Sequence, residues 1–209
     1  MGLAQQFGHP SGFLGAVVGR GMAKGNAELS RWVAQQASAH HDSGVERVAE
    51  LGPGPGVGLE ALLAQFPEAQ VWGIDVSSVM LAQSRKRNRL AVSAGRLTLL
   101  EGGVSALRAG APADIVMANH VLYFWRDPVA EMAQIRSLLG PRGLLAIGYQ
   151  LKQNMPAMAQ RRFPPAGHQL YDTDDEVTKL ATTAGFGSVK QIVKGSADAP
   201  EGRVMLATV

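Results

Sequence analysis

The segment Val48–Gly58 joins a short apolar strand to a turn that is rich in glycine. The strand reads Val-Ala-Glu-Leu, with Glu50 near its end, and glycine then alternates with other residues. Glycine lets the backbone turn sharply and approach a ligand closely. A second apolar strand, Gln70–Asp75, follows and also ends in a carboxylate. Because a carboxylate at this point can accept hydrogen bonds from both hydroxyls of a ribose, the two strands predict a nucleoside pocket at the carboxyl edge of a parallel sheet.

The glycine spacing narrows the class of ligand. Dinucleotide folds use Gly-x-Gly-x-x-Gly. Here a frame that starts at Gly52 has Val57 in the sixth position, and one that starts at Gly54 has Leu59 there. The sequence instead has an acidic residue, Glu50, followed by Gly-x-Gly-x-Gly from Gly52 to Gly56. In this motif the chain resembles the class I S-adenosylmethionine-dependent methyltransferases, over roughly residues 45–150 and more loosely beyond.

Strands and helices alternate from residue 45 onward, which predicts an α/β fold with right-handed βαβ units. The segment Lys194–Gly202 between the last two strands is too short for a crossover helix, so those strands should pair antiparallel. The resemblance implies a Rossmann-like, doubly wound, mostly parallel seven-stranded sheet with a terminal antiparallel hairpin. We expect strands at Val45–Leu51, Gln70–Val76, Arg96–Leu100, Ala113–Ala118, Gly143–Tyr149, Ser188–Val193 and Arg203–Thr208. We expect helices at Val57–Phe66, from Ser77 or Ser78, at Asp127–Leu139 with a stop at Gly140-Pro141, and from Asp172–Asp174 to Ala184.

Composition limits the class of protein. The chain has 209 residues, of which 46% are hydrophobic, enough for one domain with a full core. It has no cysteine, which excludes disulfides, thiolate nucleophiles and Cys-ligated zinc. No apolar run could span a bilayer and no signal peptide is evident, so we expect a cytoplasmic protein without a membrane partner.

We divide the chain into an N-terminal helical lid, residues 1–44, and a methyltransferase domain, residues 45–209. Asn26 could cap a helix that runs through Leu29, Trp32, Val33 and Gln36. That helix could fold over the sheet edge as a lid, or it could simply cover core; the periodicity allows both. Residues 151–171 contain three prolines and little period, and we expect a loop or cap over the active site.

The resemblance implies a role for each matching position. The backbone of the glycine turn passes under the methionine part and ribose of S-adenosylmethionine, Asp75 binds the ribose hydroxyls, and Glu50 helps to hold the ammonium group. The implied cofactor-binding residues are Glu50, Gly52, Pro53, Gly54, Gly56, Asp75, Val76, Met80, Gly103, Val104, Asn119 and His120. Many relatives have an acidic residue for the adenine amino group after the third strand. Gly103 has no side chain for that bond, so either Glu101 or backbone groups must replace it.

The run Asn119-His120-Val121-Leu122-Tyr123-Phe124-Trp125 follows the fourth strand. The [ND]-P-P-[YF] motif of enzymes that methylate adenine or glutamine amino groups is absent. The three aromatic residues either line a small-molecule pocket or pack the next helix onto the sheet. Methyl transfer needs a base only when the nucleophile arrives protonated. The candidate catalytic residues are His120, Tyr123, His168 and Tyr171.

Other features bear on partners and on alternative functions. The basic run Arg85–Arg89 suits the solvated end of a helix better than an RNA-binding patch, and the net charge of +3 is small, so a nucleic-acid partner is not expected. No residues have metal-ligand spacing, and we predict no metal. The apolar N-terminal segment could contribute to a homodimer contact. We expect methyl transfer to a small-molecule acceptor. The alternatives are a nicotinamide-dependent oxidoreductase, which lacks a Tyr-x-x-x-Lys motif here, and a non-catalytic S-adenosylmethionine-binding partner protein.

Overall fold

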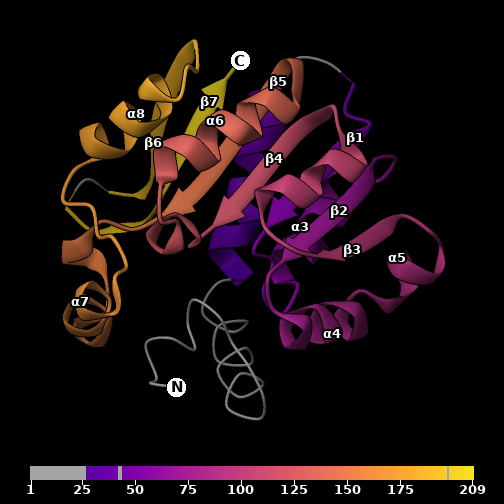
Figure 1. Cartoon of the computed structure of the whole chain (residues 1–209), viewed down its shortest axis with the longest axis horizontal. Helices are drawn as coiled ribbons and strands as arrows, with labels where there is room; N and C mark the ends of the chain where they lie inside the picture. Colours follow the sequence, from indigo (N-terminus) through magenta and orange to yellow (C-terminus); the bar gives the residue numbers. More distant parts are fainter. Residues whose placement is uncertain (1–26, 42–43, 197) are drawn as a thin grey trace.

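A computed structural model describes residues 27–41, 44–196 and 198–209. Seven strands form one sheet in the order β3-β2-β1-β4-β5-β7-β6. The first five pair in parallel, while β7 pairs antiparallel with both β5 and β6. Figure 1 shows the sheet crossing the molecule, with helices packed against it. This confirms the predicted α/β, mostly parallel sheet with a terminal antiparallel hairpin.

The strands are β1 (Arg47–Leu51), β2 (Gln70–Asp75), β3 (Leu97–Glu101), β4 (Ala113–Asn119), β5 (Leu139–Tyr149), β6 (Ser188–Gly195) and β7 (Pro200–Thr208). The α-helices are α3 (Val57–Gln65), α4 (Ser78–Arg87), α5 (Arg89–Ser93), α6 (Pro128–Leu138), α7 (Ala157–Arg162) and α8 (Asp174–Thr183), and residues 27–39 are also helical. Short 3₁₀ turns are η1 (Val104–Gly110), η2 (Leu122–Phe124), η3 (Lys152–Asn154) and η4 (Pro164–Ala166).

The apolar side chains of the strands alternate between the two faces of the sheet. In β4, Ile115 and Met117 pack on one face with α3 and the helix of residues 27–39, whereas Val116 and Ala118 pack on the other with α6 and α8. All four are fully buried. Such period-two burial on both faces is what a parallel sheet covered by two helix layers requires.

Local capping residues mark the starts of three α-helices. Ser77 caps α4 by accepting a hydrogen bond from the Met80 amide at 3.4 Å, and Asp127 caps α6 by accepting one from the Ala130 amide at 3.0 Å. Thr173 caps α8 in a reciprocal arrangement with Glu176. These caps satisfy amide groups that have no partner within the helix.

The predicted boundary between α6 and β5 is wrong. The sequence indicated a helix up to Leu139 and a strand from Gly143, with Gly140 and Pro141 between them as a stop. The structure ends α6 at Leu138, and β5 begins at once with Leu139. The reason is that Leu139 pairs with Ala113 of β4 before the register shifts. Proline is tolerated in a strand at such an irregularity.

The cap segment, residues 151–171, contains η3, α7 and η4 rather than an open loop. A partly buried polar network anchors its start. The Arg203 guanidinium on β7 lies 3.0 Å from an Asp174 carboxylate oxygen and donates to the Asn154 side chain at 3.1 Å. The Tyr149 hydroxyl donates to the same carboxylate at 2.5 Å. Because these residues come from β5, β7, α8 and η3, the network fixes the cap segment relative to the sheet.

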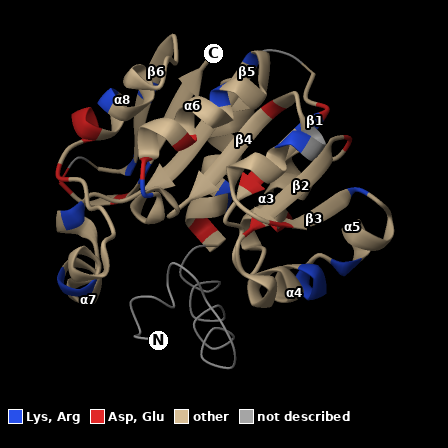
Figure 2. Cartoon of the chain, in the orientation of Figure 1, with Lys and Arg blue, Asp and Glu red and all other residues tan. Residues whose placement is uncertain are grey.

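The charges on the surface follow the predicted solvated arrangement. Figure 2 shows basic residues gathered at the end of α4, where Arg85, Lys86 and Arg87 are exposed. Arg87 also donates to the Pro55 carbonyl at 3.0 Å and pairs with Glu60 at 3.3 Å. Part of this run therefore supports the glycine turn. No helix among the described residues has the length and apolar character needed to cross a membrane.

Candidate active site

The glycine turn between β1 and α3 adopts backbone conformations that favour glycine. Gly52, Gly54 and Gly56 have φ angles of 63°, 53° and 84°. This left-handed region is costly for residues that carry a Cβ. A Cβ on Gly52 would lie 2.6 Å from the Val121 side chain, whereas one on Gly54 would meet nothing within 4 Å. Gly54 is thus the point where the backbone faces open space.

Gly56 and Gly58 serve packing. A Cβ on Gly56 would lie 2.7 Å from the Asn88 amide nitrogen. Asn88 is buried and donates to the Gly56 carbonyl at 3.0 Å, which ties the turn to the end of α4. A Cβ on Gly58 would overlap the Glu50 carboxylate. No motif in the sequence assigned a role to Gly58 or Asn88. The alternation of glycine continues to Gly58 and could have indicated a role for it. Asn88 lies within the basic run Arg85–Arg89, where no pattern distinguishes it.

Replacing Gly58 with alanine is expected to destabilise the fold by about 1–3 kcal/mol, the usual cost of overpacking. Alanine favours a helix over glycine by only about 1 kcal/mol, so the overlap with Glu50 should prevail. Urea denaturation measures the change. Gly44→Ala is the matched control, because that position has an ordinary φ and open space around it. Equal stability of the two variants would contradict the packing role.

Asp75 lies at the end of β2 and is 7% exposed. One carboxylate oxygen accepts from the Gly54 amide at 3.0 Å, and the other accepts from the Ser77 amide at 2.9 Å. A carboxylate oxygen can accept two hydrogen bonds. Asp75 therefore holds the glycine turn and the start of α4 in place.

Glu50 is buried beneath the glycine turn. One of its oxygens accepts a long hydrogen bond of 3.5 Å from the Asn119 amide, and the other has no partner. Burial raises the pKa of Glu50 to about 8; the bond from Asn119 opposes this and the charge of Asp75 adds to it. A buried carboxyl group with an unused oxygen is costly to leave unpaired. Such a group is well placed to be completed by a cationic ligand.

A cavity of about 280 Å³ opens beside Gly54 and Asp75; we call it the glycine cavity. Its lining comes from the carboxyl ends of β1, β2, β3 and β4, where parallel sheets bind ligands. The lining residues are Leu51, Gly52, Gly54, Ile74, Asp75, Val76, Met80, Gly102, Gly103, Val104, Asn119, His120, Val121, Phe124, Trp125, Arg126 and Glu131. Of the predicted cofactor-binding residues, Glu50, Pro53 and Gly56 lie outside this lining. Phe124, Trp125, Arg126 and Glu131 were not predicted for it.

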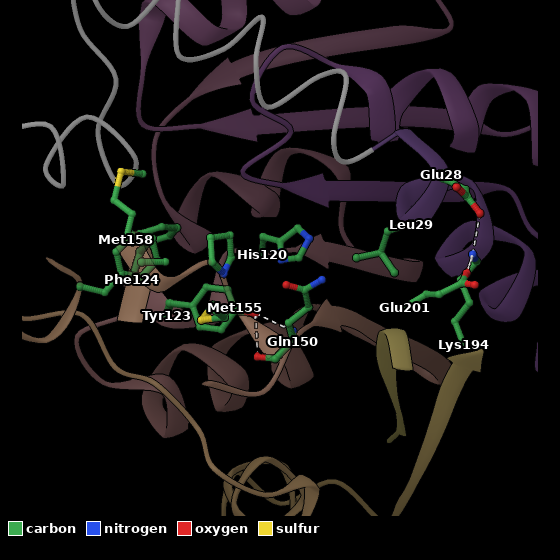
Figure 3. A pocket seen from close by; sticks show the side chains of 13 residues that line it. Glu28, Leu29, His120, Tyr123, Phe124, Gln150, Met155, Met158, Lys194 and Glu201 are labelled. Atoms are coloured by element: carbon green, nitrogen blue, oxygen red, sulfur yellow. Dashed lines mark hydrogen bonds and ion pairs between the residues drawn. The ribbon is translucent and has the colours of Figure 1, made fainter. Parts of the chain in front are cut away.

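A second cavity of about 500 Å³, the aromatic cavity, adjoins the first. Figure 3 shows its side chains, which come from the helix of residues 27–39, the segment after β4, the cap segment and the β6–β7 hairpin. The lining residues are Glu28, Leu29, His120, Tyr123, Phe124, Gln150, Met155, Pro156, Met158, Ala159, Phe163, Lys194 and Glu201. Only His120 and Phe124 line both cavities among the described residues. Tyr123 is buried in the core and also lines this cavity, so its position fits both sequence interpretations of the aromatic run.

His120 has an uncommon backbone conformation. Its φ is 55°, a left-handed value that is rare outside glycine, and its amide donates to the Gly148 carbonyl at 2.8 Å. This conformation turns its side chain to the boundary between the cavities, where its ring stacks on Tyr123 at 6.2 Å. Desolvation lowers the pKa of His120 to about 4. The imidazole is therefore neutral at pH 7 and can accept a hydrogen bond.

The other predicted catalytic residues are placed differently. The Tyr123 hydroxyl accepts from the Gln150 amide at 2.6 Å and donates to the Gln150 carbonyl at 3.1 Å. Burial raises its pKa above the usual range, so it stays a neutral structural group. Tyr171 and His168 line neither cavity among the described residues. Burial raises the pKa of Tyr171 to about 12, and its hydroxyl donates to Gln169 at 3.2 Å.

No metal centre forms within the part of the chain that the structure describes. There, no three or more histidine, aspartate or glutamate side chains come together in a way that could hold an ion. The candidate site is thus built from the glycine turn, the carboxylates at the strand ends and two adjoining cavities.

Comparison with known proteins identifies the family. A sequence profile described as a methyltransferase domain matches residues 49–145, which include the glycine turn, Asp75 and His120. The chain belongs to the class I S-adenosylmethionine-dependent methyltransferase family. Trans-aconitate 2-methyltransferase of Methylobacterium nodulans is 32% identical over 146 residues, which cover 67% of this chain and 54% of that protein. The Yersinia pestis protein of the same name is 32% identical over 114 residues and is covered to 41%.

This methyltransferase-family chain spans about half the length of the curated relatives it matches. Solved structures share its fold at lower identity. An O-methyltransferase family protein from Burkholderia thailandensis gives a TM-score of 0.73 at 18% identity, with 91% of this chain and 58% of that one covered. Magnesium protoporphyrin IX methyltransferase from Synechocystis was solved with bound S-adenosylhomocysteine. It gives a TM-score of 0.66 at 17% identity, with 88% of this chain and 83% of that chain covered. The family assignment favours S-adenosylmethionine over a nicotinamide cofactor.

Proposed function

We propose that this chain transfers the methyl group of S-adenosylmethionine to a small-molecule acceptor by in-line displacement. The observation that carries the proposal is the junction of the two cavities at His120 and Phe124. One cavity has the glycine turn and Asp75, and the other is an apolar space large enough for a small molecule. A displacement reaction needs two partners held end to end, and adjoining cavities supply that arrangement.

The residues that line the glycine cavity, together with Glu50 outside its lining, fit the cofactor. Asp75 lines the cavity with a carboxylate, the group that can accept hydrogen bonds from ribose hydroxyls, and Gly54 leaves the backbone open to close approach. Val76 and Met80 lie where they can flank an adenine, and a thioether contacts an aromatic face favourably. Glu50, with its unused oxygen, and Asn119 can hold the ammonium group. Gly103 has no side chain that could bond to adenine, so we assign the hydrogen bonds to adenine to the backbone groups of Gly103 and Val104.

When bound, S-adenosylmethionine supplies an electrophilic methyl group on a good leaving group. The chain's own part is to position the acceptor and to exclude water. We place the acceptor between two flanking segments, the helix of residues 27–39 and the cap segment. Leu29 comes from the first, and Met155, Met158 and Phe163 come from the second. We assign to these two segments the lid and cap roles expected from the sequence; residues 1–26 of the expected lid lie outside the described residues.

His120 is the residue we assign to the acceptor's proton. Its neutral imidazole at the cavity boundary can accept a hydrogen bond from a hydroxyl or amine and orient that nucleophile. With a pKa of about 4 it is too weak to remove a proton before the reaction, so it acts as the new bond forms. The Tyr123 hydroxyl makes both of its hydrogen bonds to the Gln150 backbone, so we assign Tyr123 a packing role.

The test is to replace His120 with asparagine, which tolerates left-handed backbone conformations and so preserves the turn. Binding of S-adenosylhomocysteine, followed by calorimetry, should change little. Methyl transfer should fall about 100-fold or more, the usual loss for a group that manages a proton. Acceptors come from a panel of hydroxyl- and amino-bearing aromatic compounds, with S-adenosylhomocysteine release as the readout.

Two results would contradict the proposal. If the folded wild-type protein does not bind S-adenosylhomocysteine, the assignment of the glycine cavity fails. If it binds but releases no product with the panel, a non-catalytic partner protein becomes the better interpretation. A His120→Asn variant that keeps full activity would contradict only the role assigned to His120.

A further inference from the structure

The aromatic cavity differs in character from one end to the other (Figure 3). At one end Tyr123, Phe124, Met155, Met158 and Phe163 form an apolar wall. The ring centroids of Phe124 and Phe163 lie 5.5 Å apart. Flat aromatic walls and flexible thioethers together favour a flat apolar ligand.

The other end holds one cation between two carboxylates. The Lys194 ammonium lies 2.6 Å from a Glu28 carboxylate oxygen and also contacts Glu201. The hydrogen bonds that Lys194 donates to Glu201 and Glu28 raise its pKa, and the bond from Lys194 lowers the pKa of Glu28. One ammonium thus stands against two carboxylates, so the formal charges at this end sum to one net negative charge.

Lys194 is the only cation among the described residues that line the aromatic cavity. Its ammonium is already engaged by Glu28 and Glu201, so a ligand carboxylate would have to displace one of them. It would also meet the second glutamate as a like charge. Such an arrangement selects against anions, because discrimination often rests on a repulsive element.

Gln150 lies between the two ends. Its backbone is bonded to Tyr123, but its carboxamide makes no hydrogen bond to the residues that the structure describes. Figure 3 shows this side chain reaching into the cavity between His120 and Leu29. It can donate to and accept from one uncharged polar group of a ligand.

We propose that the acceptor is a flat, uncharged molecule of two or three fused rings with one polar substituent facing Gln150, in addition to the nucleophilic group at His120, and that the cavity rejects carboxylates. The proposal rests on the function proposed above. It separates this chain from its curated relatives, which are named for trans-aconitate, a compound with three carboxylate groups. The volume of about 500 Å³ suits a ligand of that size.

The test uses naphthamide and naphthoate, which have the same shape and differ in charge, together with trans-aconitate. Each is titrated into full-length protein that is saturated with S-adenosylhomocysteine. Naphthamide should bind about tenfold or more tightly than naphthoate, and trans-aconitate should not bind. In the double variant Glu28→Gln with Glu201→Gln, Lys194 becomes unopposed, and the ratio of naphthamide to naphthoate affinity should fall to about one or below.

Several results would overturn the proposal. These are tighter binding of naphthoate or trans-aconitate than of naphthamide, no binding of any probe, or an unchanged affinity ratio in the double variant. Saturation with S-adenosylhomocysteine is measured first and separately. Its failure would reject the proposed function, whereas normal saturation with the wrong probe preference would reject only the acceptor class. Met158→Ala, at the apolar end, is the matched control variant. It should weaken the binding of naphthamide and of naphthoate by the same factor.

Discussion

Replacing Asp75 with alanine is expected to weaken the binding of S-adenosylhomocysteine by about 100-fold or more. Hydrogen bonds to a charged group contribute about 1.5–3 kcal/mol each, and the ribose would lose two of them. A factor of ten in affinity corresponds to about 1.4 kcal/mol. The same change removes the acceptors of the Gly54 and Ser77 amides, so the glycine turn should also lose its fixed position. Calorimetric titration of the variant against the wild type measures the loss.

Two controls separate the ligand contact from damage to the fold. Asp75→Asn keeps one carbonyl oxygen as an acceptor and should lose less affinity than Asp75→Ala. Asp172→Ala removes an exposed carboxylate whose Lys152 partner, at 3.6 Å, adds little stability. It should bind like the wild type. An Asp75→Ala variant that unfolds normally in urea and still binds with wild-type affinity would show that Asp75 does not hold the ribose.

Much of the frame of this site could be predicted from local sequence signals. The glycine turn, Asp75 and the caps at Ser77 and Thr173 depend on residues close together in the chain, where steric and hydrogen-bonding rules act directly. The antiparallel hairpin followed from loop length alone. Each of these predictions used only a few neighbouring residues.

The rest depends on side-chain packing and tertiary contacts that no local pattern predicts. Gly58 matters because Glu50 packs over it, and Asn88 matters because the end of α4 approaches Gly56. The Lys194 pair with Glu28 joins residues that are 166 positions apart. No periodicity or motif encodes such a pair. The role of Tyr123 changed for the same reason, since its hydroxyl is taken up by the Gln150 backbone.

Glu50 is expected to make both stability and cofactor binding depend on pH. Its folded pKa of about 8 is above the value of 4.5 for an exposed glutamate, so the folded protein binds the proton more tightly than the unfolded chain does. The contribution of Glu50 to the free energy of unfolding is therefore largest below about pH 4.5. It falls as the pH rises toward 8 and changes no further above that. Each pKa unit corresponds to about 1.4 kcal/mol, so the loss is on the order of a few kcal/mol.

The Glu50→Gln variant tests this sign. Glutamine keeps the shape and cannot ionise, so the stability of the variant should not fall between about pH 5 and pH 8 as that of the wild type does. Urea denaturation at several pH values gives the two curves. The difference in free energy of unfolding, variant minus wild type, should become more positive as the pH rises. Parallel curves would show that Glu50 titrates normally.

Cofactor binding should reverse the protonation of Glu50. An ammonium group placed at the unused carboxylate oxygen favours the charged form, so binding at pH 7 should release up to about one proton per chain. Calorimetry of S-adenosylhomocysteine in two buffers of different ionisation enthalpy counts that proton. His120, already neutral with a pKa of about 4, contributes none at this pH. Proton release should vanish in Glu50→Gln; if it persists there, another group responds to the ligand and the Glu50 assignment is wrong.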